Sequence, residues 1–256
     1  MNVRLANKVA LITGGSTGIG HAVSLAFGAE GASVAVNYIH NEAKAMETVS
    51  SIEARGGRAL AVYGDVSKGK DVSAMVAQIN EHWGGVDILV NNAGIYPRKA
   101  WYEITEEEWD LVQAVNLKSC FLTSKSVFPY MQQQGYGKII NVSSVTFLRG
   151  QKGFVHYVAS KGGIIGFTRA LSREVGIHGI TVNAISPGAV LTEQELADYP
   201  DPSIQEELRQ YLANEQAIPR RQLPGDMVGC FLYLASRESD FMTGQTLNVD
   251  GGWAMH

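Results

Sequence analysis

The chain has only two cysteines among its 256 residues, Cys120 and Cys230. Two thiols this far apart, in apolar surroundings, are too few for a disulfide framework or a thiolate zinc site, so we expect two core residues and no metal site. Basic residues are not in excess either, because 21 lysines and arginines face 25 aspartates and glutamates, for a net charge of −4. Such a chain offers no basic face to a polyanion, which disfavours a nucleic-acid partner.

Long apolar runs are also missing. No stretch reaches the ~18 uninterrupted apolar residues of a membrane-spanning helix, so we expect no membrane partner. The first dozen residues lead straight into a strand pattern, without the apolar region and small-residue cleavage site of a secretory signal, and we therefore expect a cytoplasmic location. The 28 glycines follow no short period, which favours many tight turns over a fibrous or disordered chain.

Short apolar runs alternate with longer segments of helical period along almost the whole chain. The expected strands are Lys8–Ile12, Ser33–Asn37, Ala59–Tyr63, Asp87–Val90, Lys138–Val142, Thr181–Ile185 and Gln245–Val249. The expected helices are Gly18–Glu30, Glu42–Arg55, Val72–His82, Glu106–Gln133, Tyr157–Val175 and Asp226–Ser236. The strands are almost continuously apolar, which is typical of strands buried on both faces. The pattern predicts an α/β chain with a doubly wound, seven-stranded parallel sheet and helices on both faces, a Rossmann fold.

No linker, charge block or low-complexity stretch divides the sequence, so we expect one domain over residues 1–256. One long irregular region, Gly188–Pro224, contains a helical patch at Ser203–Gln216. Because this region lies between two core elements, we expect a substrate lid at about residues 189–223.

A glycine-rich turn, Thr13-Gly-Gly-Ser-Thr-Gly-Ile-Gly20, follows the first expected strand and opens the first helix. Gly14, Gly18 and Gly20 allow a tight turn, a close approach of a pyrophosphate and close packing of helix on strand. The helix N-terminus adds free N–H groups and a favourable dipole. The turn therefore predicts a dinucleotide site, made of these glycines with Ser16, Thr17 and Ile19.

Tyr157 and Lys161 are four residues apart at the start of an expected helix, so their side chains share one face and can reach the same ligand. A phenol with a pKa of ~10 is a poor acid or base near neutrality. An ammonium about 4 Å away supplies roughly 4 kcal/mol at an effective dielectric near 20, which is enough to lower that pKa by about three units. The pair predicts a phenol that exchanges protons near neutral pH.

Several short motifs follow one another at characteristic spacing. They are Gly14–Gly20, Asn91-Asn-Ala-Gly94, Asn116, Ser144, Tyr157-Val-Ala-Ser-Lys161, Pro187-Gly188 and Thr243–Gly252. In this order they resemble the classical short-chain dehydrogenase/reductase family over nearly the whole chain. The resemblance implies an NAD(P)-dependent oxidoreductase that interconverts a secondary alcohol and a ketone by hydride transfer. It extends both to members acting on aromatic or cyclic secondary alcohols and to 3-oxoacyl-thioester reductases, which leaves the substrate open.

The same resemblance implies four catalytic residues. Tyr157 is the proton donor and acceptor at the substrate oxygen, and Lys161 lowers its pKa and binds the nicotinamide ribose. Ser144 hydrogen-bonds the carbonyl or hydroxyl and steadies the developing alkoxide. Asn116 holds the water that links Lys161 to solvent.

The cofactor is expected along the carboxyl ends of the strands. By resemblance, Asp65 and Val66 contact the adenine side, and Asn92, Ala93 and Gly94 line the adenosine ribose. The nicotinamide carboxamide is expected at the segment that follows the sixth strand. The remaining expected contacts are Tyr157, Lys161, Pro187, Gly188, Val190 and Thr192.

The choice between NADP and NAD depends on the end of the second strand. Asn37 stands where an NAD enzyme usually carries an acid, and the missing acid removes the repulsion of a 2′-phosphate. The usual phosphate-binding arginines are absent, however, since Thr17 and Tyr38 occupy their places and only His40 and Lys44 are near. We therefore expect NADP, with NAD as the alternative.

The expected substrate pocket contains aromatic side chains, which favour an apolar or cyclic carbonyl over a sugar acid. Its residues are Tyr96, Ser144, Thr146 and Phe154, with Ile95, Phe147 and His156 beside them. The expected partners are a small carbonyl or alcohol substrate and, by resemblance, further copies of the chain in a homotetramer. Two alternatives stay open, a catalytically silent dinucleotide-binding sensor or scaffold, and a methyltransferase or other nucleotide user on a similar sheet.

Overall fold

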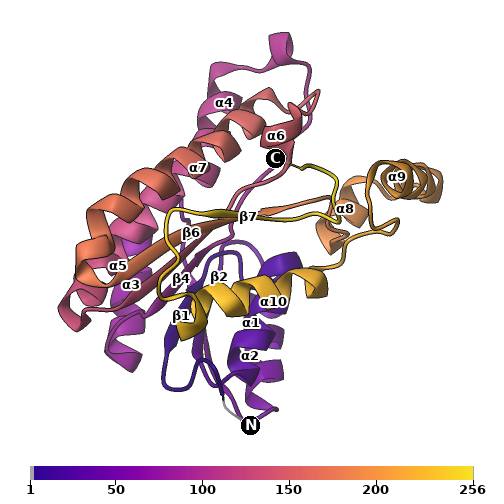
Figure 1. The fold of residues 1–256 in the computed structure, drawn as a ribbon. Helices are drawn as coiled ribbons and strands as arrows, with labels where there is room; N and C mark the ends of the chain where they lie inside the picture. The colour runs from indigo at the N-terminus through magenta and orange to yellow at the C-terminus, as the bar shows by residue number, and fades with distance from the viewer. Residues whose placement is uncertain (1–2, 256) are drawn as a thin grey trace.

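A parallel sheet forms the centre of the computed structural model, which describes residues 3–255 (Figure 1). Its strand order is β3-β2-β1-β4-β5-β6-β7, and each neighbouring pair is parallel. The strands are β1 (Val9–Ile12), β2 (Ser33–Tyr38), β3 (Arg58–Tyr63), β4 (Ile88–Asn91), β5 (Gly137–Val142), β6 (Ile180–Pro187) and β7 (Thr246–Val249). The predicted doubly wound Rossmann fold and its seven strands are confirmed.

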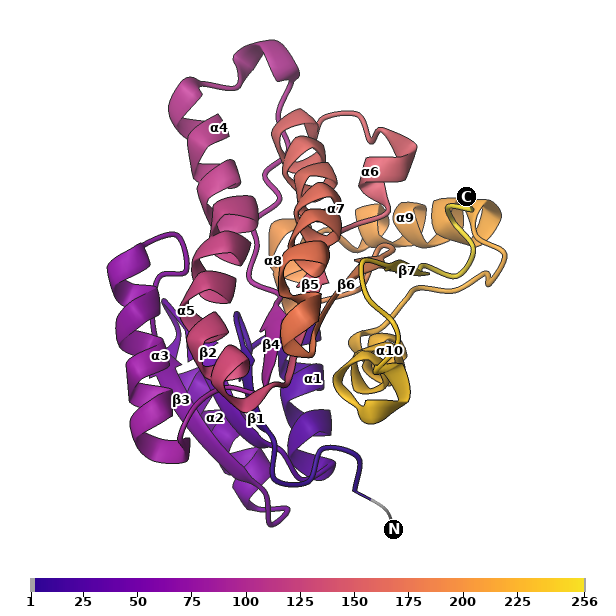
Figure 2. The ribbon, with the colours of Figure 1, turned by 60° about the vertical axis from the view of Figure 1, so that its left-hand side comes forward.

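Helices cover both faces of the sheet (Figures 1 and 2). One face carries α1 (Gly18–Ala29), α2 (Glu42–Glu53) and α10 (Pro224–Ala235). The other carries α3 (Gly69–Trp83), α4 (Glu106–Gln113), α5 (Ser119–Gln134) and α7 (Val155–Val175). Within β1, Ala10 and Ile12 belong to the first hydrophobic core, whereas Val9 and Leu11 belong to the second. This alternation of faces explains why the strands are apolar throughout.

Strand order decides where ligands can bind. β1 and β4 are neighbours at the centre, and the connections wind outward in opposite directions from this point, which opens a crevice at the carboxyl ends of the strands. Asn91 of β4 donates to Asn141 of β5 at 2.8 Å, and both side chains are buried. Thr123 of α5 donates to Asn91 at 2.7 Å, and Asn141 donates to Thr168 of α7 at 2.9 Å. These bonds fix α7 relative to the sheet.

The segment predicted as one helix over Glu106–Gln133 is helical throughout and contains one π-helical turn. α4 begins with a capping box between Thr105 and Glu108, and its helix gives way to the π-helical turn η2 (Ala114–Lys118) before α5 begins. The wider turn contains Asn116, whose side chain bonds to the loop after β4 instead of to solvent. The backbone is helical throughout, so the predicted helix over Glu106–Gln133 is confirmed, and only the π-helical turn within it was missed, because periodicity does not register one extra residue in a turn.

Residues 189–223 leave the sheet edge and return close to where they left (Figure 1). Val190 and Gln222 form a parallel bridge, and Leu191 N donates to Gln222 O at 2.8 Å. Two helices lie between these points, α8 (Glu193–Asp198), capped by Thr192, and α9 (Pro202–Glu215), capped by Asp201. α9 confirms the predicted helical patch, whereas α8 and α6 (Thr146–Arg149) are too short for the periodicity to reveal.

Candidate active site

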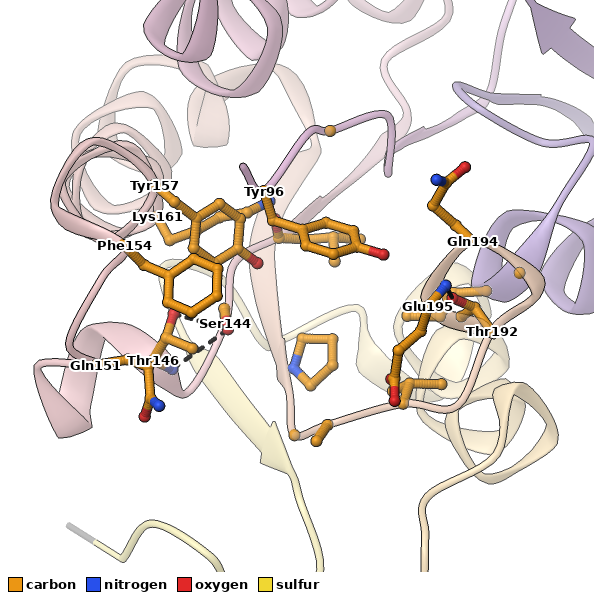
Figure 3. A pocket seen from close by; sticks show the side chains of 18 of the residues that line it. Tyr96, Ser144, Thr146, Gln151, Phe154, Tyr157, Lys161, Thr192, Gln194 and Glu195 are labelled. Carbon is orange, nitrogen blue, oxygen red and sulfur yellow. Dashed lines mark hydrogen bonds between the residues drawn. The ribbon is translucent and has the colours of Figure 1, made fainter. Parts of the chain in front are cut away.

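A cavity of about 660 Å³ opens at the carboxyl ends of the central strands, between the sheet and α8 and α9 (Figure 3). It brings together residues that the sequence analysis took from widely separated motifs. These are Gly14, Thr17, Gly18, Ile19, Asn92, Ala93, Gly94, Tyr96, Ser144, Thr146, Phe154, Tyr157, Lys161, Pro187, Gly188, Val190 and Thr192. The glycine turn and the Tyr157–Lys161 pair therefore face one common space.

Other expected site residues do not line this cavity. They are Ser16, Gly20, Asn37, Tyr38, Asp65, Val66 and Asn116, and, around the expected substrate pocket, Ile95, Phe147 and His156. Several of them lie one layer behind the wall. Asn37, Asn116 and His156 are at most 2% exposed, so contacts of these side chains with a ligand would need the wall to move.

The glycine turn is held from two sides. Gly14 and Gly18 have φ of 60° and 52°, a region that favours glycine, and a Cβ on Gly20 would lie only 2.1 Å from the Gly14 oxygen. Asn37 Oδ1 accepts from Gly14 N at 3.2 Å, while Asn92 Nδ2 donates to the Gly14 oxygen, also at 3.2 Å. Asn37 thus shapes the turn from behind.

The turn presents a main-chain donor that already binds a negatively charged side chain. The first turn of α1 holds no acidic residue, and Thr17 does not cap it with its side chain. Instead, Gly18 N donates to the Glu193 carboxylate, on α8, at 3.1 Å. A carboxylate oxygen here stands in for a phosphate oxygen at a helix N-terminus. The residues present therefore fit the pyrophosphate of a dinucleotide, which the glycine turn and the N-terminus of α1 would hold.

Ser144 follows β5 and lies beside Tyr157 (Figure 3). Its Oγ accepts hydrogen bonds from Thr146 N at 3.2 Å and from Thr146 Oγ1 at 3.0 Å, so its own proton is free to point elsewhere. Burial raises the pKa of Tyr157, and the hydrogen bond with Ser144 opposes that rise. Donation from Ser144 stabilises the phenolate, which is the direction that acid–base chemistry requires.

Lys161 lies against the same phenol ring. Its Nζ is 5.6 Å from the centre of the Tyr157 ring, so the predicted shared face is confirmed, and it donates to the main-chain oxygen of Val142 at 2.8 Å. Burial lowers the pKa of Lys161 to about 8. The expected lowering of the Tyr157 pKa by Lys161 is not found: burial of the phenol raises it, and the opposing influence comes from Ser144.

Asn116 connects the site to the loop after β4. Its Oδ1 accepts from Ile95 N at 2.8 Å, and its Nδ2 donates to Ile95 O at 2.9 Å and to Ser160 Oγ at 3.0 Å. A Cβ on Gly94 would lie 3.2 Å from Asn116 Oδ1 and 3.6 Å from Lys161 Nζ. Only a glycine leaves this space open between the amide and the ammonium.

An aromatic group surrounds the phenol. The ring centres of Tyr96 and Phe154 lie 6.3 and 6.1 Å from that of Tyr157, both edge to face. Tyr96 also reaches the lid, because its hydroxyl interacts with Asp198 and Thr192. Burial and the Asp198 carboxylate both raise the pKa of Tyr96, so this hydroxyl remains a proton donor.

The structure adds lining residues that sequence reasoning missed. They are Arg98, Val142, Ser143, Gln151, Ala189, Glu193, Gln194, Glu195, Tyr199, Ile204, Glu207, Leu208, Tyr211 and Trp253. For three of them the sequence did contain a signal: Ile204, Leu208 and Tyr211 recur at helical spacing and so share one apolar face of the predicted lid helix. Glu195 is neutralised by Arg221, whose Nη2 lies 2.7 and 2.8 Å from the two carboxylate oxygens.

Residues 3–255 contain neither a candidate metal site nor a candidate membrane-spanning helix. No group of three or more histidine, cysteine or acidic side chains is arranged to hold a metal ion there. No helix in the same range combines the length and the apolar character needed to cross a bilayer.

Comparison with known proteins agrees with this geometry. Residues 14–254 match the family model described as enoyl-(acyl carrier protein) reductase. The chain is 40% identical over 248 residues to nodulation protein G of Azospirillum brasilense, covering 97% of this chain and 98% of that protein. It is 37% identical over 249 residues to 3-oxoacyl-[acyl-carrier-protein] reductase FabG of Staphylococcus epidermidis, covering 97% and 100%.

A solved structure shows the same fold. A short-chain type dehydrogenase/reductase from Mycobacterium marinum superposes with a TM-score of 0.90 at 35% identity, over 100% of this chain and 98% of that one. The curated relatives and the solved structure belong to one family, whose members use the nicotinamide cofactors NAD or NADP. The chain belongs to the short-chain dehydrogenase/reductase family and is an oxidoreductase.

Proposed function

We propose that the enzyme interconverts a ketone and a secondary alcohol, with NADP as the preferred cofactor and NAD as the alternative. One observation carries the proposal: Ser144, Tyr157 and Lys161 line the same cavity as the anion-binding glycine turn. When bound, the nicotinamide would supply or accept the hydride. The protein's task is then to hold the substrate and to handle a proton.

The phenol of Tyr157 acts as the acid and base of the reaction. Tyr157 donates its proton to the substrate oxygen during reduction and takes it back during oxidation. When substrate is bound, Ser144 would turn its single proton from the Tyr157 oxygen to the substrate oxygen and steady the developing charge there. Lys161, with a pKa lowered to about 8, lies against the same phenol ring, and its ammonium would bind the nicotinamide ribose. The buried surroundings of both groups strengthen these interactions.

The cofactor preference rests on the end of β2. Asn37 is buried, and its amide donates to Gly64 O at 3.0 Å while its oxygen accepts from Gly14 N. The site thus presents no carboxylate from this position to a 2′-phosphate. His40 and Lys44 follow in the sequence and could offer positive charge.

Three further residues have proposed roles in the site. Asp65 and Val66 would contact the adenine of the cofactor, and Asn116 would hold a water molecule.

The substrate is proposed to have an apolar or cyclic body. The rings of Tyr96, Phe154 and Tyr157 pack edge to face around the reacting end of the cavity. Thr146 lies next to Ser144 at the opening of this aromatic group. Flat or cyclic molecules bury area against such rings at low entropic cost. Residues 189–223 would act as the lid of this single-domain enzyme.

A homotetramer is proposed for the assembly. α4, α5 and α7 expose large apolar side chains, among them Leu111, Phe121 and Val155, and these are the helices expected to pair between copies. Burial of these side chains against a second copy would remove apolar area from water. The cytoplasmic location stays a prediction from the N-terminal sequence.

The test uses the purified enzyme with NADPH and with NADH and a panel of cyclic, aromatic and thioester ketones. Nicotinamide absorbance should fall with at least one ketone, faster with NADPH than with NADH. Cofactor affinity is measured separately by calorimetry. A protein that binds neither cofactor would contradict the proposal, and one that binds cofactor without turning over any ketone or alcohol would favour a silent sensor or scaffold.

A further inference from the structure

Two consecutive cations on the loop after β4 differ in their partners. Lys99 Nζ lies 2.7 Å from both carboxylate oxygens of Glu108. Arg98, which lines the cavity, forms no ion pair or hydrogen bond with any residue in the described part of the chain. Lys99, outside the cavity lining, is therefore neutralised by a carboxylate, whereas Arg98, in the cavity lining, is available to bind a ligand.

The Arg98 side chain is nevertheless held in place. Its guanidinium carbon lies 6.0 Å from the centre of the Phe154 ring, in a cation–π contact. Its stem passes over Gly153, where an added Cβ would lie 3.2 Å from Arg98 Cγ. The main chain is fixed at the same point, because Lys99 N donates to Gly153 O at 2.9 Å. A guanidinium ordered in this way loses little freedom when it binds a ligand.

The position of Arg98 relates it to the reacting end of the cavity. Phe154 is a neighbour of both groups, because its ring centre lies 6.0 Å from the Arg98 guanidinium carbon and 6.1 Å from the centre of the Tyr157 ring. Two other carboxylates of the cavity lining have partners elsewhere: Glu193 accepts from Gly18 N, and Glu195 is paired with Arg221. Glu207, on α9, also lines the cavity but forms no ion pair with Arg98. A free cation therefore lies one aromatic ring away from the catalytic phenol.

We propose that Arg98 binds a carboxylate of the substrate, so that the ketone is a keto acid whose apolar body lies against Phe154. This inference rests on the proposed function and extends it to the substrate class. The planar fork of a guanidinium matches the two oxygens of a carboxylate, and a charge-assisted pair in an apolar-walled cavity is favourable. Gln151 lines the same cavity, and its side-chain amide has no hydrogen-bond partner within residues 3–255.

The experiment compares matched pairs of ketones that differ in one group, such as 4-acetylbenzoate, its methyl ester and the corresponding phosphate ester of 4-hydroxyacetophenone. Binding to the enzyme with saturating NADP is measured by calorimetry, and kcat/KM is measured with NADPH. The wild type should favour the carboxylate over the ester by about tenfold to a hundredfold, the range of one charged hydrogen-bonded pair. The preference should shrink as salt is raised, because Arg98 is exposed.

Two variants distinguish binding of the carboxylate by Arg98 from a general effect of positive charge near the cavity. Arg98→Gln should abolish the preference for the acid, so that the ratio of kcat/KM for the acid to kcat/KM for the ester falls to about one. Lys152→Gln removes an exposed cation two residues from Phe154 and outside the cavity lining, and should keep the preference. An ester that binds as well as its acid, or an Arg98→Gln enzyme that still prefers the acid, overturns the inference. Tighter binding of the phosphate ester than of the carboxylate overturns the choice of carboxylate. Failure to bind NADP would contradict the proposed function instead.

Discussion

The ammonium nitrogen of Lys161 lies 5.6 Å from the centre of the Tyr157 ring and donates a hydrogen bond to the Val142 oxygen at 2.8 Å. Lys161 is buried and Tyr157 is half-buried at the cavity wall, so each charged form has lost part of its hydration. Burial raises the pKa of the phenol from its ordinary value of 10 and lowers the pKa of the amine from 10.5 to about 8, so the two values move apart and each neutral form is favoured. Two ionisable groups with shifted pKa values at one cavity wall are typical of a functional site.

The lowered pKa of Lys161 gives a pH dependence of stability. Folding lowers this pKa from 10.5 to about 8, so between these values the unfolded chain binds more protons and stability rises with pH. Below pH 8 the full penalty is present, about 3 kcal/mol for such a shift. Lys161→Met should remove it. The free-energy advantage of the variant over the wild type should therefore decrease between pH 8 and pH 10.5.

The effect is measured by denaturant unfolding of the wild type and of Lys161→Met between pH 8 and pH 10.5. Titratable groups that both proteins share cancel in the difference between their unfolding free energies. The lost hydrogen bond to Val142 adds an offset that does not vary with pH. A difference in unfolding free energy that stays constant across the range would show that Lys161 is not buried as described.

Asn37→Asp should shift cofactor preference toward NAD. A carboxylate at this buried position would add negative charge behind the glycine turn and repel a 2′-phosphate through space, without touching the cofactor. The variant should also be less stable by ~1–3 kcal/mol, because the aspartate cannot donate to Gly64 O as the amide does. The ratio of kcat/KM for NADPH to that for NADH is the measurement. Asn41→Asp is the control, an equal charge change at an exposed helix cap where aspartate is equally favourable. If both variants leave the ratio unchanged, Asn37 does not set the preference.

Glu193→Gln should bind NADP more tightly, by several-fold to about tenfold at low salt. The Glu193 carboxylate accepts from Gly18 N, where it places negative charge next to a pyrophosphate site. The amide keeps an acceptor oxygen but loses the charge. Calorimetric titration with NADP at two salt concentrations measures the gain. Glu207→Gln makes the same charge change in the same cavity without contacting Gly18, and an equal gain in that variant would contradict a local effect.

The elements of the sheet could be predicted from the sequence because burial on both faces leaves a continuous apolar signal. Each expected strand is present, with ends displaced by one or two residues, as for Lys8–Ile12 and β1. Features that depend on one turn could not be predicted. The π-helical turn around Asn116 and the four-residue helix α6 are too short to produce a period of their own.

The site was predictable where a motif fixes the backbone. Gly14, Ser144, Tyr157 and Lys161 were found from spacing and resemblance, and they line one cavity. The electrostatics were not predictable, because the raised pKa of Tyr157 reflects how much protein surrounds it, which spacing does not encode. Contacts made by lid and loop residues were missed for the same reason, since the pairing of Glu193 with Gly18 joins residues 175 positions apart.

Turnover by Tyr157→Phe tests the central role of the phenol most directly. The substitution removes one hydroxyl and keeps the ring that packs against Tyr96 and Phe154. With the best ketone of the panel, kcat should fall by about 10²–10⁴, as expected for lost acid–base catalysis, while the Kd for NADP changes little. Unchanged turnover at unchanged cofactor affinity would contradict the assignment of Tyr157 as the acid and base.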